Sequence, residues 1–219
     1  MQIENYDNNQ IAELLRDAKS VGIIASRLNQ PDTFCAASGL YLMLKNTFED
    51  KEIKLIYKGD IPTECSNLIN SEDVHANVDE RDLVVTVNYK GTSASKVQYS
   101  TEDGVFQFRL GPVPKYFDLG NIQSVLSGFD FDVVVTIGIP DLEVTGSLYS
   151  SLKHELSSAK IVNIDNTGLN KRFGSVNVID TQASSLSTLV FNLAAEWKLK
   201  PTAKSAKMLL VGVSSTSID

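Results

Sequence analysis

The sequence predicts an α/β fold in which a mostly parallel sheet carries helices on both faces, with a small antiparallel β insert. Short continuous apolar runs such as Val21–Ser26 and Val133–Ile137 alternate with longer segments whose apolar residues recur at helical spacing, the pattern of buried parallel strands joined by helices. Apolar residues at alternate positions around Glu102-Asp103-Gly104 favour an antiparallel hairpin. With 219 residues, 42% of them apolar, the chain is long enough to bury such a core.

The N-terminal part predicts a helix followed by a β-α-β unit. Apolar residues at positions i, i+3, i+4 and i+7 form one face of a helix, and a short uninterrupted apolar run is typical of a strand covered on both sides. Asn8 or Asn9 is expected to cap the first helix. The elements are a helix with its apolar face at Ile11, Leu14, Leu15 and Ala18, a strand at Val21–Ser26, a helix with its face at Ala37, Leu40, Tyr41 and Leu44, and a strand at Ile53–Tyr57.

Residues 83–113 are predicted to form the β insert. Its strand-like segments are Leu83–Tyr89, Lys96–Tyr99 and Val105–Leu110. The run Gly111-Pro112-Val113-Pro114 is expected to end it, because proline cannot continue a hydrogen-bonded ladder.

The alternation of strands and helices resumes after the insert. The pattern predicts strands at Val133–Ile137, Lys160–Ile164 and Lys207–Val213, a helix at Leu142–Leu156, and a long helix with its apolar face at Leu186, Leu189, Val190, Leu193, Ala194 and Trp197. We therefore expect residues 1–219 to form a single α/β domain that carries the insert.

Composition narrows the function classes. Twenty basic and 27 acidic residues give a net charge of −7, which disfavours a nucleic-acid partner, because phosphate backbones are held by clustered Lys and Arg. Cys35 and Cys65 match no zinc or disulfide spacing and are expected to be reduced thiols. The N-terminus lacks a signal-peptide pattern and no run of about 18 apolar residues occurs, so we expect a cytoplasmic protein without a membrane partner.

Polar residues follow four of the predicted strands, where ligands gather at the carboxyl edge of a parallel sheet. These corners are Leu28–Ser38, Gly138–Leu142, Asp165-Asn166-Thr167 and Gly212–Thr216. The third follows the apolar run Ile161–Ile164.

The four corners, in this order, resemble the motifs of the DHH-family phosphoesterases, the RecJ-like group that includes nano-RNA and cyclic-dinucleotide phosphodiesterases. Pro31-Asp32 and Ser38 match the family's first motif, Ile139-Pro140-Asp141-Leu142 matches the turn of its second, and Asn163-Ile164-Asp165 leads into the Asp-His-His of its third. The resemblance spans about Val21 to Thr216 and implies the family's α/β fold.

The metal-ligand positions implied by the resemblance are mostly replaced. Only Asp32 and Asp165 remain, and Asn88 is a neutral relic of another acidic position. We expect no bound metal, because two manganese-type ions need several carboxylates and imidazoles. The replaced positions are Leu28 at the first histidine, Phe34 and Gly138 at two aspartates, and Asn166 and Thr167 at the paired histidines.

Two further expectations come from the resemblance. The family's smaller C-terminal substrate-binding domain has no counterpart in these residues, and Lys171-Arg172, beside the replaced site, are candidates for contacting a phosphate, which Arg suits geometrically. A solvated charged turn is the other interpretation of that pair.

Three functional hypotheses follow. The first is a DHH-like domain that has lost catalysis and serves as a binding or assembly module. Its partner is another protein, met through the insert with its aromatic residues Tyr89, Tyr99, Phe106 and Phe108 or its open sheet edge, or alternatively a second copy of the chain. The second is a weak phosphodiesterase acting on short oligonucleotides or cyclic dinucleotides with Mn²⁺ or Mg²⁺ at Asp32 and Asp165. The third is a sensor that binds a nucleotide without hydrolysing it.

Overall fold

The chain is organised as two compact units. A computed structural model describes residues 7–76, 82–127 and 130–216. The first compact unit, called the α/β unit, comprises Met1–Glu80 and Phe129–Asp219. The second, called the β unit, comprises Arg81–Gly128. Among the described residues, no helix combines the length and the apolar content needed to cross a membrane.

A six-stranded parallel sheet forms the centre of the α/β unit, in the order β10-β9-β8-β1-β2-β3. The central strands β1, β8 and β9 are almost entirely buried, as expected for strands covered on both faces. The strands are β1 (Ser20–Ala25), β2 (Glu52–Ile56), β3 (Val74–His75), β8 (Val133–Ile137), β9 (Lys160–Asp165) and β10 (Val176–Ile179).

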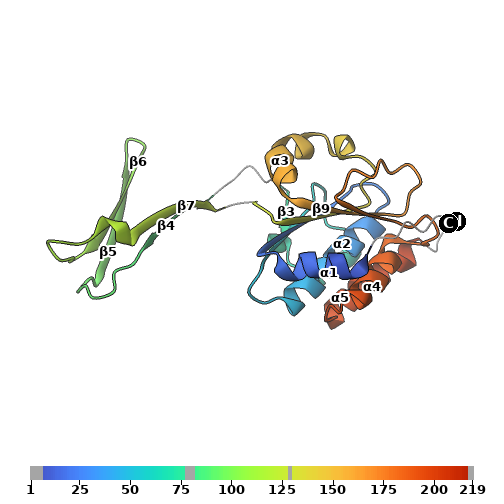
Figure 1. Cartoon of the computed structure of the whole chain (residues 1–219), viewed down its shortest axis with the longest axis horizontal. Coiled ribbons are helices and arrows are strands. Elements are labelled where there is room, and N and C mark those ends of the chain that lie inside the picture. The colour runs from blue at the N-terminus through green and yellow to red at the C-terminus, as the bar shows by residue number, and fades with distance from the viewer. Residues whose placement is uncertain (1–6, 77–81, 128–129, 217–219) are drawn as a thin grey trace. The chain divides into compact units, whose positions relative to one another are not determined.

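Helices cover both faces of this sheet, which confirms the predicted fold class (Figure 1). On one face, residues of α1, α2, α4 and α5 pack with Ile23, Val135 and Val162 in the larger core. On the other, Leu152 and Leu156 of α3 pack in the smaller core. The helices are α1 (Asn8–Asp17), α2 (Asp32–Thr47), α3 (Ser147–Ser158), α4 (Leu186–Glu196) and α5 (Ala203–Ser215), with short 3-10 turns η1 (Thr63–Cys65), η2 (Ser71–Asp73) and η4 (Leu142–Thr145).

The strand predicted at Lys207–Val213 is wrong, because this segment is part of helix α5. Thr202 and Ser205 form a capping box at its start, and the buried positions 205, 208, 209 and 212 follow helical spacing. Gly212 lies against α2, since a side chain there would meet the Cβ of Cys35 at 2.8 Å.

The last strand of the sheet is β10, which the sequence analysis missed. The predicted helix at Leu142–Leu156 divides into η4 and α3 at Gly146, which has a φ of 58°.

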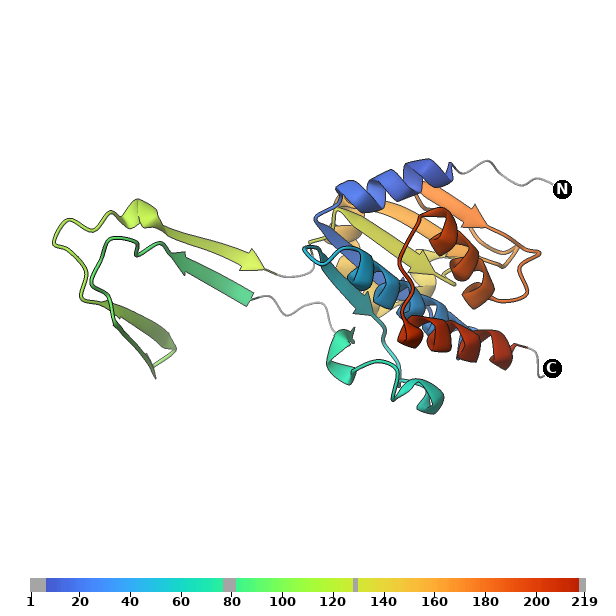
Figure 2. The same ribbon diagram turned by 90° about the horizontal axis from the view of Figure 1, so that it is seen from below.

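The β unit consists of two antiparallel strand pairs (Figure 2). β5 and β6 form a hairpin closed at Asp103-Gly104, where both residues have positive φ as the tight turn requires. β7 pairs with β4, so the unit extends past the proline-containing segment that we expected to end the insert at residue 113. Its elements are β4 (Asp82–Val87), β5 (Lys96–Glu102), β6 (Val105–Gly111), η3 (Leu119–Asn121) and β7 (Ile122–Ser127).

Candidate functional site

The sheet reverses its strand order between β1 and β8. From β1 the chain continues to β2 on one side, whereas β8, β9 and β10 extend on the other. In open parallel sheets, ligands bind beyond the carboxyl ends of the strands at such a point. A cleft of about 320 Å³ lies there, lined by Ala25, Ser26, Arg27, Leu28, Lys58, Ile139, Val144, Thr145 and Gly146.

Two cationic side chains, Arg27 and Lys58, line this cleft together with apolar side chains. The sequence analysis did not single them out. Arg27 directly follows the strand predicted at Val21–Ser26, so its place at the carboxyl edge was a signal in the sequence. Lys58 follows β2 in the same way.

The two replaced ligand positions of the first motif, Leu28 and Phe34, lie in different environments. Leu28 is 46% exposed and lines the cleft. Phe34 is fully buried in the core and packs against Tyr57, with ring centroids 4.9 Å apart. The second aspartate position of the motif is therefore part of the hydrophobic core.

Asp32 is buried and binds the N-terminus of another helix. Its Oδ2 accepts a hydrogen bond from the Leu186 N–H at 2.6 Å, and its Oδ1 accepts one from the Ser187 N–H at 2.9 Å. These are unsatisfied donors of the first turn of α4, where the helix dipole also favours a negative charge. The carboxylate thus joins α2 to α4.

Gly138 follows β8 at the aspartate position of the second motif and leaves no space for a side chain. Its φ is 65°, and a Cβ there would lie 2.9 Å from Leu186 Cδ1 and 3.0 Å from Thr33 Cγ2. A non-glycine residue at this position would be strained both in its backbone and by contact.

Asp165 ends β9 and accepts three hydrogen bonds from the loop that follows it. Its Oδ1 accepts from the N–H groups of Asn166 at 2.8 Å and Thr167 at 3.3 Å, and its Oδ2 accepts from Asn170 Nδ2 at 2.7 Å. Burial raises the pKa of Asp165, while these hydrogen bonds act in the opposite direction. The carboxylate is therefore held by donors of its own loop.

A buried amide network continues from Asp165 to the neighbouring strands. Asn163 Nδ2 donates to Asn170 Oδ1 at 2.8 Å and to Asn177 Oδ1 at 3.3 Å, and its Oδ1 accepts from the Thr136 hydroxyl at 3.1 Å. This links β8, β9 and β10, and each buried amide is paired, as buried polar groups require.

The residues at the two histidine positions of the third motif also bond within the fold. Asn166 Nδ2 donates to the Ala183 carbonyl at 3.2 Å, and Thr167 Oγ1 accepts from the Leu169 N–H at 3.3 Å. Neither an amide nor a hydroxyl supplies the basic nitrogen with which imidazole binds a transition metal.

The two candidate phosphate contacts lie in the loop between β9 and β10, where the side chain of Lys171 and the backbone of Arg172 have partners. Lys171 Nζ forms an exposed ion pair with Asp141, which raises the pKa of Lys171 and lowers that of Asp141. The Arg172 N–H donates to Asn170 Oδ1 at 2.7 Å. Asn88 lies in the β unit after β4, where its Oδ1 accepts from the Lys90 N–H at 3.2 Å.

Within residues 7–76, 82–127 and 130–216, no three His, Cys, Asp or Glu side chains gather closely enough to hold a metal ion. The donor set does not fit the binuclear centre implied by the sequence motifs, because the two remaining carboxylates serve N–H donors and the other positions carry no ligand.

Cys35 and Cys65 come together although their spacing gave no signal. Both are buried and free, with their sulfur atoms 3.4 Å apart. The contact with Cys65 and burial raise the pKa of Cys35, which keeps this thiol protonated and weakly reactive.

Comparisons with known proteins identify the fold. No family model matches the chain, and no curated protein matches it. The solved structure of an exopolyphosphatase-related protein from Bacteroides fragilis superimposes with a TM-score of 0.64 at 14% identity, covering 99% of this chain and 52% of that one. The chain thus spans about half the length of the neighbour and shares the α/β fold of that part.

Proposed function

We propose that the α/β unit keeps a phosphoesterase-like fold without its hydrolytic activity and serves as a binding or assembly module. The observation that carries this proposal is that the carboxylates of Asp32 and Asp165 serve as hydrogen-bond acceptors within the fold. Each carboxylate oxygen accepts a hydrogen bond from the fold, and within the described residues no group of three His, Cys, Asp or Glu side chains gathers to hold a divalent ion.

Metal titration and hydrolysis assays test the proposal. Isothermal titration with MnCl₂ should give no saturable binding at millimolar metal, and bis-p-nitrophenyl phosphate and a linear dinucleotide should not be hydrolysed. Residual turnover that disappears in Asp165→Ala and persists in Asp180→Ala would favour the weak phosphodiesterase and overturn the proposal. Asp180 is a suitable control because its Oδ1 accepts from the Gln182 N–H at the surface.

A second candidate function is non-hydrolytic binding of a phosphate-bearing small molecule in the cleft at the β1/β8 edge. Arg27 and Lys58 line this cleft in a chain whose net charge is −7, and Leu28, Ile139 and Val144 give it an apolar surface of the kind that bases contact. The neighbour's description as exopolyphosphatase-related supports the same ligand class.

A thermal-shift screen with mononucleotides, cyclic dinucleotides and tripolyphosphate tests this candidate. A ligand at 100 times its Kd stabilises the native state by about 2.7 kcal/mol, so the shift in Tm is measurable. It should be lost in Arg27→Ala and kept in Lys171→Ala, because Lys171 pairs with Asp141 and does not line the cleft. A flat screen would contradict the candidate.

A further inference from the structure

The β unit has no buried side chain of its own among residues 83–124. In a two-stranded ribbon each strand has an unpaired edge, and such ribbons are marginal in water unless a third strand or another layer covers an apolar face. The β5–β6 hairpin nevertheless has a seven-pair register. A layer that covers an apolar face of this hairpin would supply the burial that the ribbon lacks.

The hairpin is amphipathic. The cross-strand pairs Val97↔Leu110, Tyr99↔Phe108 and Thr101↔Phe106 place their side chains on one face, which we call the aromatic face. Tyr99 and Phe106 stack on it with ring centroids 6.1 Å apart.

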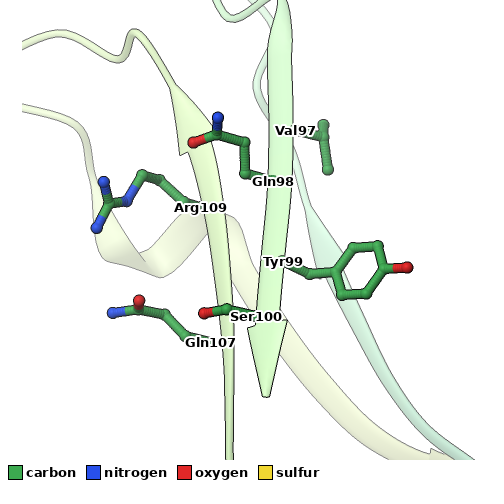
Figure 3. A pocket seen from close by; sticks show the side chains of 6 residues that line it. All are labelled: Val97, Gln98, Tyr99, Ser100, Gln107 and Arg109. Carbon is green, nitrogen blue, oxygen red and sulfur yellow. The ribbon is translucent and has the colours of Figure 1, made fainter. Parts of the chain in front are cut away.

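The opposite, polar face carries Gln98, Ser100, Gln107 and Arg109. Figure 3 shows Val97 and Tyr99 on one side of β5 and these polar side chains on the other. The hollow in that view is lined from both faces, so it is open ribbon surface and not an enclosed cavity.

The aromatic face is large enough for a symmetric contact. Tyr99, Phe106 and Phe108 are 76%, 66% and 48% exposed, and at about 200 Å² for each aromatic side chain this face offers roughly 400–500 Å² with Val97. Two copies face to face would bury roughly 900 Å² from the strands alone, close to the value of about 1,000 Å² expected of a specific interface. Val113 and Tyr116, exposed directly after β6, add apolar area.

Charge along the hairpin selects how two copies would pair. The turn carries Glu102 and Asp103, whereas the segments at the open end, 88–96 and 111–117, contain three lysines, at positions 90, 96 and 115, and no acidic residue. Strands of seven residues separate the two ends by about 20 Å, beyond the Debye length of about 8 Å at physiological salt. Opposite charges therefore meet only if the turn of one copy lies over the open end of another.

We propose that the aromatic faces of two copies of this chain pack together about a two-fold axis perpendicular to the strands, with the turn of each hairpin over the open end of its partner. This deepens the proposed assembly role, on which it rests. Tyr99 and Phe108, at the middle of their strands, lie nearest the axis, and the polar faces remain in solvent. An interface of this modest area is typical of weak, reversible complexes.

Sedimentation equilibrium of the full chain, from low micromolar to several hundred micromolar, tests this inference. The wild-type protein should show a reversible monomer–dimer equilibrium, and Tyr99→Ser/Phe108→Ser should raise Kd at least tenfold. The matched control Gln98→Ala/Gln107→Ala changes the polar face of the same hairpin and should keep the wild-type Kd. A wild-type protein that stays monomeric, or an aromatic-face variant that dimerises normally, would overturn the inference.

Charge reversal tests the arrangement of the two copies. Lys115→Glu, in the open-end segment after β6, should raise Kd by about two- to fivefold, the size of one or two exposed ion pairs. Lys96→Glu is the matched control, because its side chain lies on the polar face with Gln98, and it should change Kd less. An unchanged or lower Kd in Lys115→Glu would overturn the turn-over-open-end arrangement.

Failure of the dimer and failure of the proposed function are separable. A monomeric protein that neither binds manganese nor hydrolyses phosphodiesters would refute the dimer alone. A dimer that hydrolyses phosphodiesters in an Asp165-dependent way would refute the loss of catalysis alone. Far-UV circular dichroism checks that the variants fold, and all side chains substituted in the β unit are exposed.

Discussion

The two units of this chain use apolar side chains in opposite ways. In the α/β unit, five consecutive residues of β8 are buried and helices on both faces supply their contacts. In the β unit, strand β5 exposes all seven of its residues and strand β6 exposes five of seven. The first unit contains its own core, whereas the described part of the second leaves its apolar side chains exposed.

This difference indicates where each unit's function can reside. In the α/β unit, two positions that the sequence motifs assign to metal ligands contribute to the fold, as Asp32 does at the start of α4 and Phe34 does in the core. In the β unit, residues that contribute little to a core of their own form a continuous aromatic face. Substitutions should therefore affect unfolding in one unit and association in the other.

The largest expected effect is that of Phe34→Ala. Removing a fully buried aromatic side chain should lower the free energy of unfolding of the α/β unit by about 3–5 kcal/mol. Leu28→Ala, in the same motif but 46% exposed, should change it by less than about 0.5 kcal/mol. Urea denaturation followed by circular dichroism measures both, and similar losses would refute the assignment of Phe34 to the core.

Asp32→Ala should have the next largest effect, a loss of about 2–4 kcal/mol, because it removes the acceptor for two N–H groups of α4 and leaves them buried. The sign of this change in the free energy of unfolding distinguishes a carboxylate that stabilises the fold from one that is kept for metal binding. A carboxylate kept for metal binding would repel its neighbours in the metal-free protein, so its removal would stabilise the fold. Asp180→Ala is the surface control, and a stabilising Asp32→Ala would break the comparison between the units.

Much of the fold could be predicted from local patterns. The strands at 21–26 and 133–137 are buried on both faces, so their sequences are continuously apolar and distinctive. The segment 207–213 is equally apolar, which predicts a strand, but it belongs to helix α5. The capping box at Thr202 and Ser205 and the buried spacing through Met208 and Gly212 were the signals for a helix.

The site was predictable only in part, because its contacts are distant in sequence. The motif order identified Asp32 and Asp165, but no local pattern indicates that Asp32 binds N–H groups of Leu186 and Ser187, more than 150 residues away. The lack of space at Gly138 likewise depends on Leu186 and Thr33. Tertiary packing therefore determines both the hydrogen-bond partners of Asp32 and the lack of space at Gly138.

A smaller, pH-dependent effect is expected at Asp165. Burial raises its pKa in the folded state, so its contribution to stability is complete below the unfolded value of about 3.9 and is lost as pH rises through the folded pKa. Asp165→Asn stays neutral, so its stability relative to the wild type should increase from acidic to neutral pH.

Urea unfolding of both proteins across this pH range measures that slope. Asn at this position also places an amide beside the donor Asn170 Nδ2, which gives a constant offset and leaves the slope unaffected. A relative stability that falls with rising pH would mean that the hydrogen bonds from Asn166, Thr167 and Asn170 outweigh burial.

The smallest expected effect on the α/β unit is that of Tyr99→Ser. Because Tyr99 is exposed in the β unit, the unfolding free energy of the α/β unit should change by less than about 0.5 kcal/mol. Amide hydrogen exchange resolves the two units: protection of β5 and β6 should rise with protein concentration in the wild type and stay low in Tyr99→Ser, while β1 and β8 exchange equally slowly in both. Equal protection of β5 and β6 in the two proteins at every concentration would mean that the hairpin is stable without a partner, and the contrast between the units would then lie in exposure alone.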